Sequence, residues 1–236
     1  MSQSKFQLYY WPLPFRGCFV SYLFAYKGEP LEMFTDHDVI RGLISKPPSE
    51  QENTPFTGPP LLIEKETGLS ISQTPAIVLY VSGLLGLKPK DEFDAAMCMK
   101  ILMDCNDVLM EICRYNGEMM WDRESWRNFR TKRLPRWMTV FEEMLIRGHF
   151  GKPAVSYADI GVFALFGNMT RCLPELDADL KAHAPGVYAH CKKIGAHPSL
   201  AAFVKGQEEA YGKLYCGGQI EASIREMLEQ DKRDLG

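Results

Sequence analysis

The spacing of apolar residues along this chain changes once, at the charged segment 88–92. Before this segment, short strand-like runs alternate with helical patterns, whereas after it the apolar residues recur with the helical period of about 3.6 residues. Domains commonly contain about 100–200 residues, so a chain of 236 residues can hold two modest domains. We therefore predict a mixed α/β domain at residues 1–87 and an all-helical domain at residues 92–236.

The first predicted domain consists of two units joined by a loop. The expected elements are, in order, a strand at 6–11, a helix at 15–26, a strand at 31–35, and a hairpin with strands at 60–64 and 69–71. Gly28 ends the first helix, and the proline-rich segment 36–58 is mostly loop with room for one short helix. Thr74 is expected to be the N-cap of the helix after the hairpin, with Pro75 at its first position. The order βαβ, loop, ββα is the thioredoxin-like layout.

The second predicted domain has a helical pattern throughout. One apolar stripe runs along residues 97–112, and Trp126 belongs to a further helical pattern. Additional helices are expected at 135–147, 157–170, 186–195, 199–212 and 219–231. Ser156 and Asp159 have the spacing of a capping box, in which each side chain bonds the backbone N–H of the other residue. We interpret this pair as structural, because it fixes a helix start.

The composition argues against several classes of function. The net charge is -3 and no basic run is present, so a nucleic-acid partner is not expected. No stretch approaches the roughly 20 apolar residues of a membrane helix. Residues 1–5 have no apolar core of a signal peptide, so a cytoplasmic location is expected. The seven cysteines are scattered without a CxxC pair, so neither a disulfide framework nor a metal site is expected.

Four local patterns, in register along the chain, resemble the cytosolic glutathione transferases. They are the segments 10–16 with 27–28, 59–62 with 73–77, 155–160, and 198–203. The first is similar to the mu, pi and sigma classes, in which a tyrosine ends the first strand and an arginine follows in the first helical turn. The resemblance implies the glutathione transferase fold, a thioredoxin-like α/β domain followed by an all-α domain. It also implies a two-fold homodimer that uses glutathione as co-substrate.

Tyr10 is the residue that we expect to activate glutathione. A free thiol has a pKa of about 8.5, so only a few percent is thiolate at neutral pH. A hydroxyl group that donates a hydrogen bond to the sulfur favours the thiolate. Tyr9 is the alternative donor, but neighbours on a strand point to opposite faces, so only one of the two can face the site. The serine- or cysteine-dependent classes are disfavoured, because segment 12–14 has neither residue and Cys18 falls inside the helix.

The resemblance implies a set of glutathione-binding residues. Arg16 supplies a positive charge beside the tripeptide. Gln73 and Thr74 bind the γ-glutamyl carboxylate at a helix N-terminus, where backbone N–H groups and the helix dipole favour an anion. Asp107 reaches across the dimer to the glutamyl amine, and Lys46 meets the glycine carboxylate.

The proline pair departs from the family pattern. The residue before the family's cis-proline pairs with the cysteinyl backbone of glutathione through both its N–H and its C=O. If Pro60 is the cis residue, Pro59 occupies that position and has no N–H to donate. If Pro59 is the cis residue, Gly58 makes the pair. We prefer Pro60, and we expect a longer hairpin because Gln73 lies about two residues further on than in the pi class.

The expected function is conjugation of glutathione to an electrophilic, apolar second substrate, a detoxifying reaction. The residues expected around this substrate lie in the first strand-helix loop and on the first helix of the second domain: Leu13, Phe15, Met110, Arg114 and Tyr115. A glutathione-dependent isomerase or reductase is the second interpretation. A non-catalytic interaction protein of the same fold is the third. The pattern leaves open whether the tail at 215–236 covers the pocket.

Overall fold

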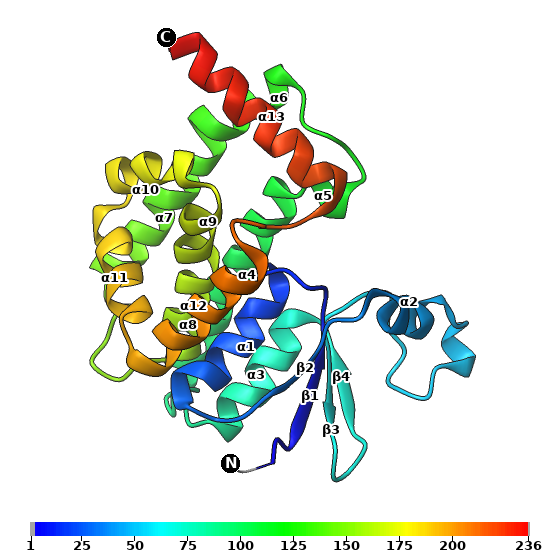
Figure 1. Cartoon of the computed structure of the whole chain (residues 1–236). Helices are drawn as coiled ribbons and strands as arrows, with labels where there is room; N and C mark the ends of the chain where they lie inside the picture. Colours follow the sequence, from blue (N-terminus) through cyan, green and yellow to red (C-terminus); the bar gives the residue numbers. More distant parts are fainter. Residues whose placement is uncertain (1–2, 236) are drawn as a thin grey trace.

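The computed structural model describes residues 3–235, so Met1, Ser2 and Gly236, at the outer ends of the two predicted domains, lie outside the described residues. A four-stranded sheet with flanking helices forms the N-terminal part, and a larger helical assembly follows it (Figure 1). The predicted class, an α/β part followed by an all-α part, is confirmed. Within residues 3–235, no helix combines the length and apolar character that crossing a membrane requires.

The sheet contains parallel and antiparallel pairs in the order β2-β1-β3-β4. Its strands are β1 Phe6–Tyr9, β2 Glu32–Phe34, β3 Leu61–Glu64 and β4 Ser70–Ser72. β1 pairs with β2 in parallel and with β3 antiparallel, with Leu8 opposite Leu62. Phe6, Leu8 and Tyr10 are buried, whereas the side chain of Tyr9 stacks on Phe34 of β2. This alternation places Tyr10 on the core face of the sheet, at the point where β1 ends.

The helices of the N-terminal part are α1 Arg16–Lys27, α2 His37–Ser45, the 3₁₀ turn η1 Pro48–Glu50 and α3 Thr74–Leu84. Gly28 ends α1 in the left-handed conformation, as expected. The prediction for the start of α3 is wrong by one residue. Gln73 is the N-cap and Thr74 is the first helical residue, because Gln73 has a φ of 70° that no helix accommodates. Pro75 still fits the first turn, where its missing N–H leaves no bond unmade.

The C-terminal part is entirely helical over the residues that the structure describes. Its elements are α4 Glu92–Ile112, α5 Arg114–Gly117, α6 Arg123–Asn128, the π-helical turn η2 Phe129–Arg133, α7 Leu134–Ile146, α8 Tyr157–Val162, the π-helical turn η3 Phe163–Gly167, α9 Asn168–Cys172, the 3₁₀ turn η4 Pro174–Leu176, α10 Asp177–His183, α11 Pro185–Gly195, α12 Pro198–Tyr211 and α13 Gly218–Leu235. Helix α10 is not predicted by the sequence pattern, because it spans only 7 residues and is too short to show a helical period.

Helix α1 is fixed from both sides. It packs on α3 within the N-terminal part and on α8 and α12 of the helical part. Tyr22 of α1 lies 5.5 Å from Phe163 between ring centroids and donates a hydrogen bond of 2.9 Å to Gln207. The N-terminus of α1, which faces the end of β1, is therefore held in place by both parts of the molecule.

The start of α8 depends on one buried carboxylate. Asp159 is 1% exposed and accepts hydrogen bonds from the N–H of Ser156 at 2.7 Å and from the N–H of Gly151 at 2.6 Å. His190 Nε2 lies 3.3 Å from the same carboxylate. The capping box that the sequence predicts is present. Its Asp159 also fixes the preceding loop through the hydrogen bond from Gly151.

We expect Asp159→Ala to lower the free energy of unfolding by about 2–4 kcal/mol, because the buried N–H of Ser156 and the partly buried N–H of Gly151 lose their acceptor. Urea unfolding of purified protein measures the change. Asp36→Ala is the matched control, since Asp36 caps α2 on the surface and its loss should cost about 1 kcal/mol. Equal losses for the two variants would contradict the special role of Asp159.

Candidate functional site

A cavity of about 550 Å³ opens where β1 ends. Its walls come from the end of β1, the start of α1, α2, the loop before β3 and the start of α3. One face of α4, the turn after it and the segment 216–220, which leads into α13, complete them. The predicted site residues that line it are Tyr10, Phe15, Arg16, Pro59, Pro60, Gln73, Thr74 and Met110. Residues that are far apart in the sequence thus meet around one space.

Tyr10 is the buried phenol of this cavity. Its side chain is 3% exposed, and its hydroxyl oxygen accepts a hydrogen bond of 2.8 Å from the backbone N–H of Arg16. Burial raises the pKa of Tyr10 well above its usual value, although the Arg16 charge and N–H oppose the increase. The phenol therefore keeps its proton at neutral pH. With an acceptor position of the oxygen already used, the O–H can donate to a ligand.

Arg16 brings an uncompensated positive charge to the cavity. Its Nη2 atom lies 3.0 Å from Met110 Sδ and 3.8 Å from Cys113 Sγ, both on or next to α4. The guanidinium also lies 5.0 Å from the centroid of the Phe15 ring. Among the residues that the structure describes, no carboxylate oxygen lies within 4.0 Å of it. The charge is thus available to an anionic group of a ligand.

The start of α3 presents polar groups that lack partners. Thr74 is 6% exposed, and its buried hydroxyl has no hydrogen-bond partner among the described residues. Gln73 has φ 70° and ψ 116°, a conformation that is uncommon for a residue with a side chain. The first N–H groups of a helix are also without intrahelical partners. Together these groups can bind a carboxylate.

The loop before β3 contributes two prolines. The peptide bond between Pro59 and Pro60 is cis, in agreement with the preference for Pro60. Pro59 has no N–H, so its backbone offers a ligand only the carbonyl oxygen.

Lys46 and Asp107 do not line the cavity. The ammonium group of Lys46 lies 3.6 Å from Glu52 in an exposed ion pair. Asp107 is exposed on α4, while its neighbour Asn106 lines the cavity. Partial burial, together with repulsion from Asp104 and Glu111, raises the pKa of Asp107. In this arrangement the Lys46 ammonium group contacts Glu52 and not the cavity, and Asp107 does not line the cavity of its own subunit.

Leu13, Arg114 and Tyr115, which we also expected around a second substrate, do not line the cavity. Leu13 packs behind the wall, because its Cδ2 atom lies against Gly217. The guanidinium of Arg114 lies 4.7 Å from the Trp121 ring centroid, and Tyr115 is 55% exposed. Of the predicted group, only Phe15 and Met110 line the cavity directly.

A left-handed turn supplies a wall that sequence reasoning missed. Arg114, Tyr115 and Asn116 have φ values of 47°, 55° and 61° directly after α4. Asn116 lines the cavity, and its backbone N–H donates a hydrogen bond of 3.3 Å to Cys113 Sγ. The pair Asn116-Gly117 is the only local signal, since both residue types tolerate this conformation.

The C-terminal segment closes one side of the cavity, because Cys216 and Ile220 line it. We call residues 212–217 the strap. The carboxylate of Glu221 accepts hydrogen bonds from the N–H groups of Tyr215, Cys216 and Gly217 at 2.9, 2.9 and 2.6 Å. The Tyr215 ring meets Phe15 edge-on with centroids 5.2 Å apart. The strap is therefore held by its own helix and by the first loop of the site.

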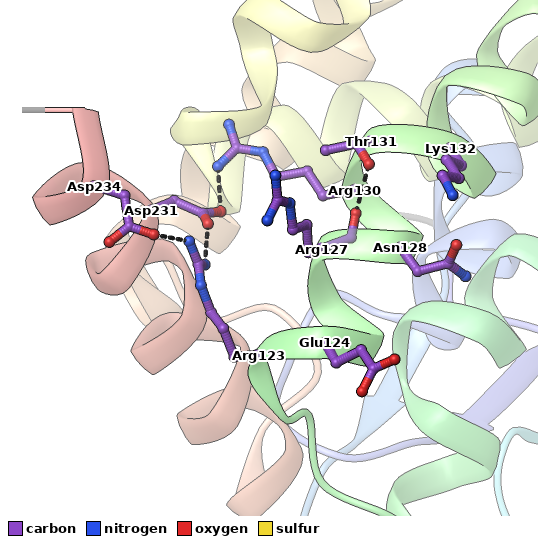
Figure 2. Close-up of a pocket in the computed structure, with 9 residues that line it drawn as sticks. All are labelled: Arg123, Glu124, Arg127, Asn128, Arg130, Thr131, Lys132, Asp231 and Asp234. Atoms are coloured by element: carbon purple, nitrogen blue, oxygen red, sulfur yellow. Dashed lines mark hydrogen bonds and ion pairs between the residues drawn. The ribbon is translucent and has the colours of Figure 1, made fainter.

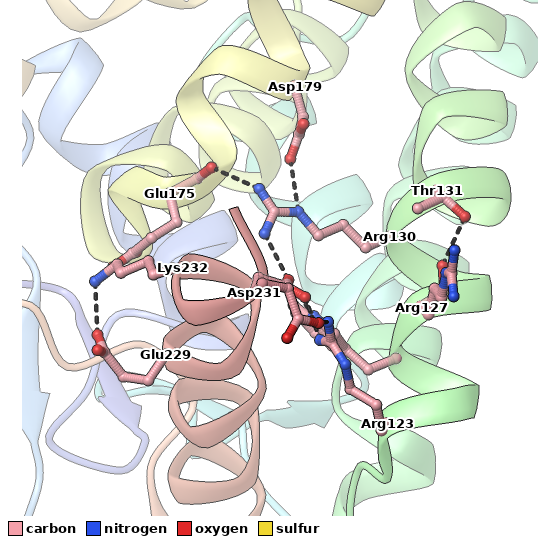
Figure 3. Close-up of polar contacts among 11 residues, drawn as sticks. Arg123, Arg127, Arg130, Thr131, Glu175, Asp179, Glu229, Asp231 and Lys232 are labelled. Carbon is pink, nitrogen blue, oxygen red and sulfur yellow. Dashed lines mark hydrogen bonds and ion pairs between the residues drawn. The ribbon is translucent and has the colours of Figure 1, made fainter. Parts of the chain in front are cut away.

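The far end of α13 is anchored by Asp231. This carboxylate accepts hydrogen bonds from Arg123, from Arg130 at 2.6 Å and from the Trp126 ring N–H at 2.8 Å. Figure 3 shows the Arg130 guanidinium between Asp231 and Asp179. Burial raises the pKa of Asp231, but these hydrogen bonds outweigh it, so the pKa lies below its usual value.

Arg123, Arg130 and Asp231 border a second cavity, of about 990 Å³, between α6 and α13 (Figure 2). Arg123 and Arg130 are already paired with carboxylates there. The described residues that line this cavity do not include Tyr10 or the start of α3. The ion pairs of Arg123 with Asp231 and Asp234 beside this cavity join α6 to α13.

We expect Asp231→Asn to lower the free energy of unfolding by about 1.5–3 kcal/mol at pH 7, because a partly buried charged acceptor of three hydrogen bonds is lost. The folded pKa of Asp231 is below the value of about 3.9 for a free aspartate, so its charge stabilises the fold above that pH. This contribution is lost as the pH falls through the folded pKa. The difference from wild type should therefore shrink below about pH 4, as measured by thermal unfolding.

Asp234→Asn is the control for this experiment, because Asp234 also pairs with Arg123 but is 65% exposed. Exposed ion pairs contribute roughly 0–1 kcal/mol. If Asp234→Asn destabilised the protein as much as Asp231→Asn, the anchor would not be Asp231.

The helical part of the chain matches the model of a known protein family. The family model for the glutathione S-transferase C-terminal domain matches residues 97–227, more than half of the chain. The chain therefore belongs to the glutathione S-transferase family of enzymes, and the resemblance seen in the sequence is confirmed at the level of the family.

Individual relatives agree with this assignment. A glutathione S-transferase of Plasmodium falciparum (isolate 3D7) is 23% identical over 215 residues, which cover 86% of this chain and 96% of that protein. The pi-class glutathione S-transferase of Onchocerca volvulus has a TM-score of 0.72 at 16% identity, covering 91% of this chain and 98% of that one. Prostaglandin synthase D of Nilaparvata lugens has a TM-score of 0.71 at 18% identity, covering 86% and 98%. At these identities, the structural likeness shows a shared fold.

Proposed function

We propose that this protein is a glutathione transferase in which Tyr10 stabilises the glutathione thiolate. One observation carries the proposal: the Tyr10 oxygen accepts the Arg16 N–H at 2.8 Å, which leaves the phenol proton for a ligand in the cavity. The guanidinium of Arg16, which has no carboxylate partner among the described residues, adds positive charge near the sulfur. Both effects favour the thiolate over the thiol.

The binding of glutathione is proposed as follows. Its γ-glutamyl carboxylate occupies the start of α3, where the Thr74 hydroxyl has no partner among the described residues and Gln73 precedes the first N–H groups of the helix. Its cysteinyl N–H donates to the Pro59 carbonyl, next to Pro60. Because Pro59 has no N–H, one hydrogen bond of the usual pair is missing, and glutathione affinity is lowered accordingly. Lys46 takes the glycine carboxylate after leaving Glu52.

The second substrate occupies the other half of the cavity. The proposed walls are Phe15, Met110 and Ile220, with Leu13 behind them. Arg114 and Tyr115 are proposed to lie at the rim rather than inside. The thiolate attacks an electrophilic carbon of this substrate and forms a carbon–sulfur bond. Such conjugation is a detoxifying reaction, which we place in the cytoplasm.

A glutathione-dependent isomerase or reductase is the second candidate. The observation that favours it is the Arg16 guanidinium, which lies beside the apolar side chain of Met110 and has no carboxylate partner in residues 3–235, an arrangement that suits a substrate with an acidic group. A protein that binds glutathione but does not conjugate a chlorodinitrobenzene-type electrophile would support this candidate. Failure to bind glutathione at all would support a non-catalytic interaction protein of the same fold.

We expect Tyr10→Phe to raise the apparent pKa of the rate profile by about one to two units. A hydrogen bond to a charged group contributes roughly 1.5–3 kcal/mol, and one pKa unit corresponds to about 1.4 kcal/mol. Conjugation at neutral pH should fall by about 10- to 100-fold. The pH dependence of kcat/KM for the electrophile, with glutathione at saturation, measures both effects.

Tyr9→Phe is the matched control, because Tyr9 stacks on Phe34 with centroids 4.6 Å apart and does not line the cavity. It should leave the pH profile unchanged. An unchanged profile in Tyr10→Phe would remove Tyr10 from the mechanism.

We further propose a homodimer in which Asp107 reaches the glutamyl amine of glutathione bound to the other subunit. Met103 lies one helical turn from Asp107 and is exposed, as is Phe93 on the same helix, so this side of α4 is apolar enough to be covered. Light scattering at micromolar concentration should give twice the chain mass. Asp107→Asn should raise the KM for glutathione with little change in kcat, and a monomer would contradict the shared site.

A further inference from the structure

Gly17 lies directly beneath the Tyr10 ring. A Cβ atom built on Gly17 would lie 2.4 Å from Tyr10 Cδ1, 2.6 Å from Cγ and 3.0 Å from Cε1. Carbon atoms in contact normally lie about 3.5–4.0 Å apart. The ring of Tyr10 therefore occupies the space that any other residue at position 17 would need for its side chain.

The backbone at Gly17 does not require glycine. Gly17 is the second residue of α1 and has ordinary helical geometry, since it is not among the glycines with positive φ. Glycine is the least favourable residue for a helix apart from proline. An alanine side chain at position 17 is therefore excluded by the Tyr10 ring and not by the backbone conformation.

The collision with a methyl group could not be relieved by turning the ring. Rotation about the Cβ–Cγ bond of Tyr10 leaves Cγ in place, and Cγ itself is one of the atoms that is too close. Either Tyr10 or the start of α1 would have to move by about 1 Å to restore normal contacts. Such a movement would disturb the 2.8 Å hydrogen bond between the Arg16 N–H and the Tyr10 hydroxyl, because Arg16 directly precedes Gly17.

We propose that Gly17 is a positioning residue for thiolate activation: its missing side chain seats the Tyr10 ring so that the hydroxyl meets both the Arg16 N–H and the glutathione sulfur. This inference rests on the function proposed above. Gly17 does not touch the reacting atoms and acts only through Tyr10.

The test compares Gly17→Ala with wild type in two measurements. Ultraviolet titration of the enzyme–glutathione complex should show the thiol ionising at a pH higher by about one unit. The kcat/KM at neutral pH should fall by about tenfold, while the KM for glutathione changes little, because the carboxylate site at α3 is untouched. Gly206→Ala is the matched control, since Gly206 lies inside α12 with open space around its Cβ position.

The Tyr10→Phe background separates the two proposals. In this background Gly17→Ala should have no further effect on the thiol titration, because the hydroxyl is already absent. If Tyr10→Phe leaves the titration unchanged, the proposed mechanism fails. If Tyr10→Phe shifts the titration and Gly17→Ala does not, only the role of Gly17 is overturned.

The effect of Gly17→Ala on the melting temperature is a further test. Gly17→Ala should lower the melting temperature in wild type but not in a Tyr10→Ala background, which has no ring to collide with. Equal losses in the two backgrounds would show that the methyl group meets something other than Tyr10 and would overturn the proposal.

Discussion

The hydrogen bond from the Arg16 N–H to the Tyr10 hydroxyl is the interaction on which the site depends. It joins the end of β1 to the start of α1 and places the phenol at the positive end of a helix dipole. The two partners can meet because α1 is packed on α3 from one side and on α8 and α12 from the other. Packing far from the cavity therefore holds the helix whose first N–H group bonds the Tyr10 hydroxyl.

Much of the fold could be predicted because its signals are local. Alternating burial of Phe6, Leu8 and Tyr10 follows from the two-residue period of a strand. The start of α8 was predicted from Ser156 and Asp159 alone, because a capping box is encoded within four positions. The boundary of α3 was missed by one residue, since the conformation of Gln73 is set by its surroundings and not by its own preference.

One side of the cavity can be predicted from local sequence signals, whereas the opposite side cannot. The side that we propose for glutathione follows family motifs within the first 77 residues, so the residues at the start of α3 can be named from the sequence. The opposite side includes Cys216 and Ile220, which come from a distant segment held by the Glu221 carboxylate. No short sequence pattern connects these residues to Tyr10, and only tertiary packing brings them together.

The left-handed turn after α4 has a consequence for sequence variation. Arg114, Tyr115 and Asn116 occupy a region of backbone space that disfavours side chains branched at Cβ. Valine or isoleucine at these positions would be strongly disfavoured, whereas glycine, asparagine or aspartate would relieve the backbone. In related chains that keep this turn, positions 114–116 should therefore more often carry small or amide residues. A residue branched at Cβ at one of these positions would indicate a cavity with a differently shaped wall.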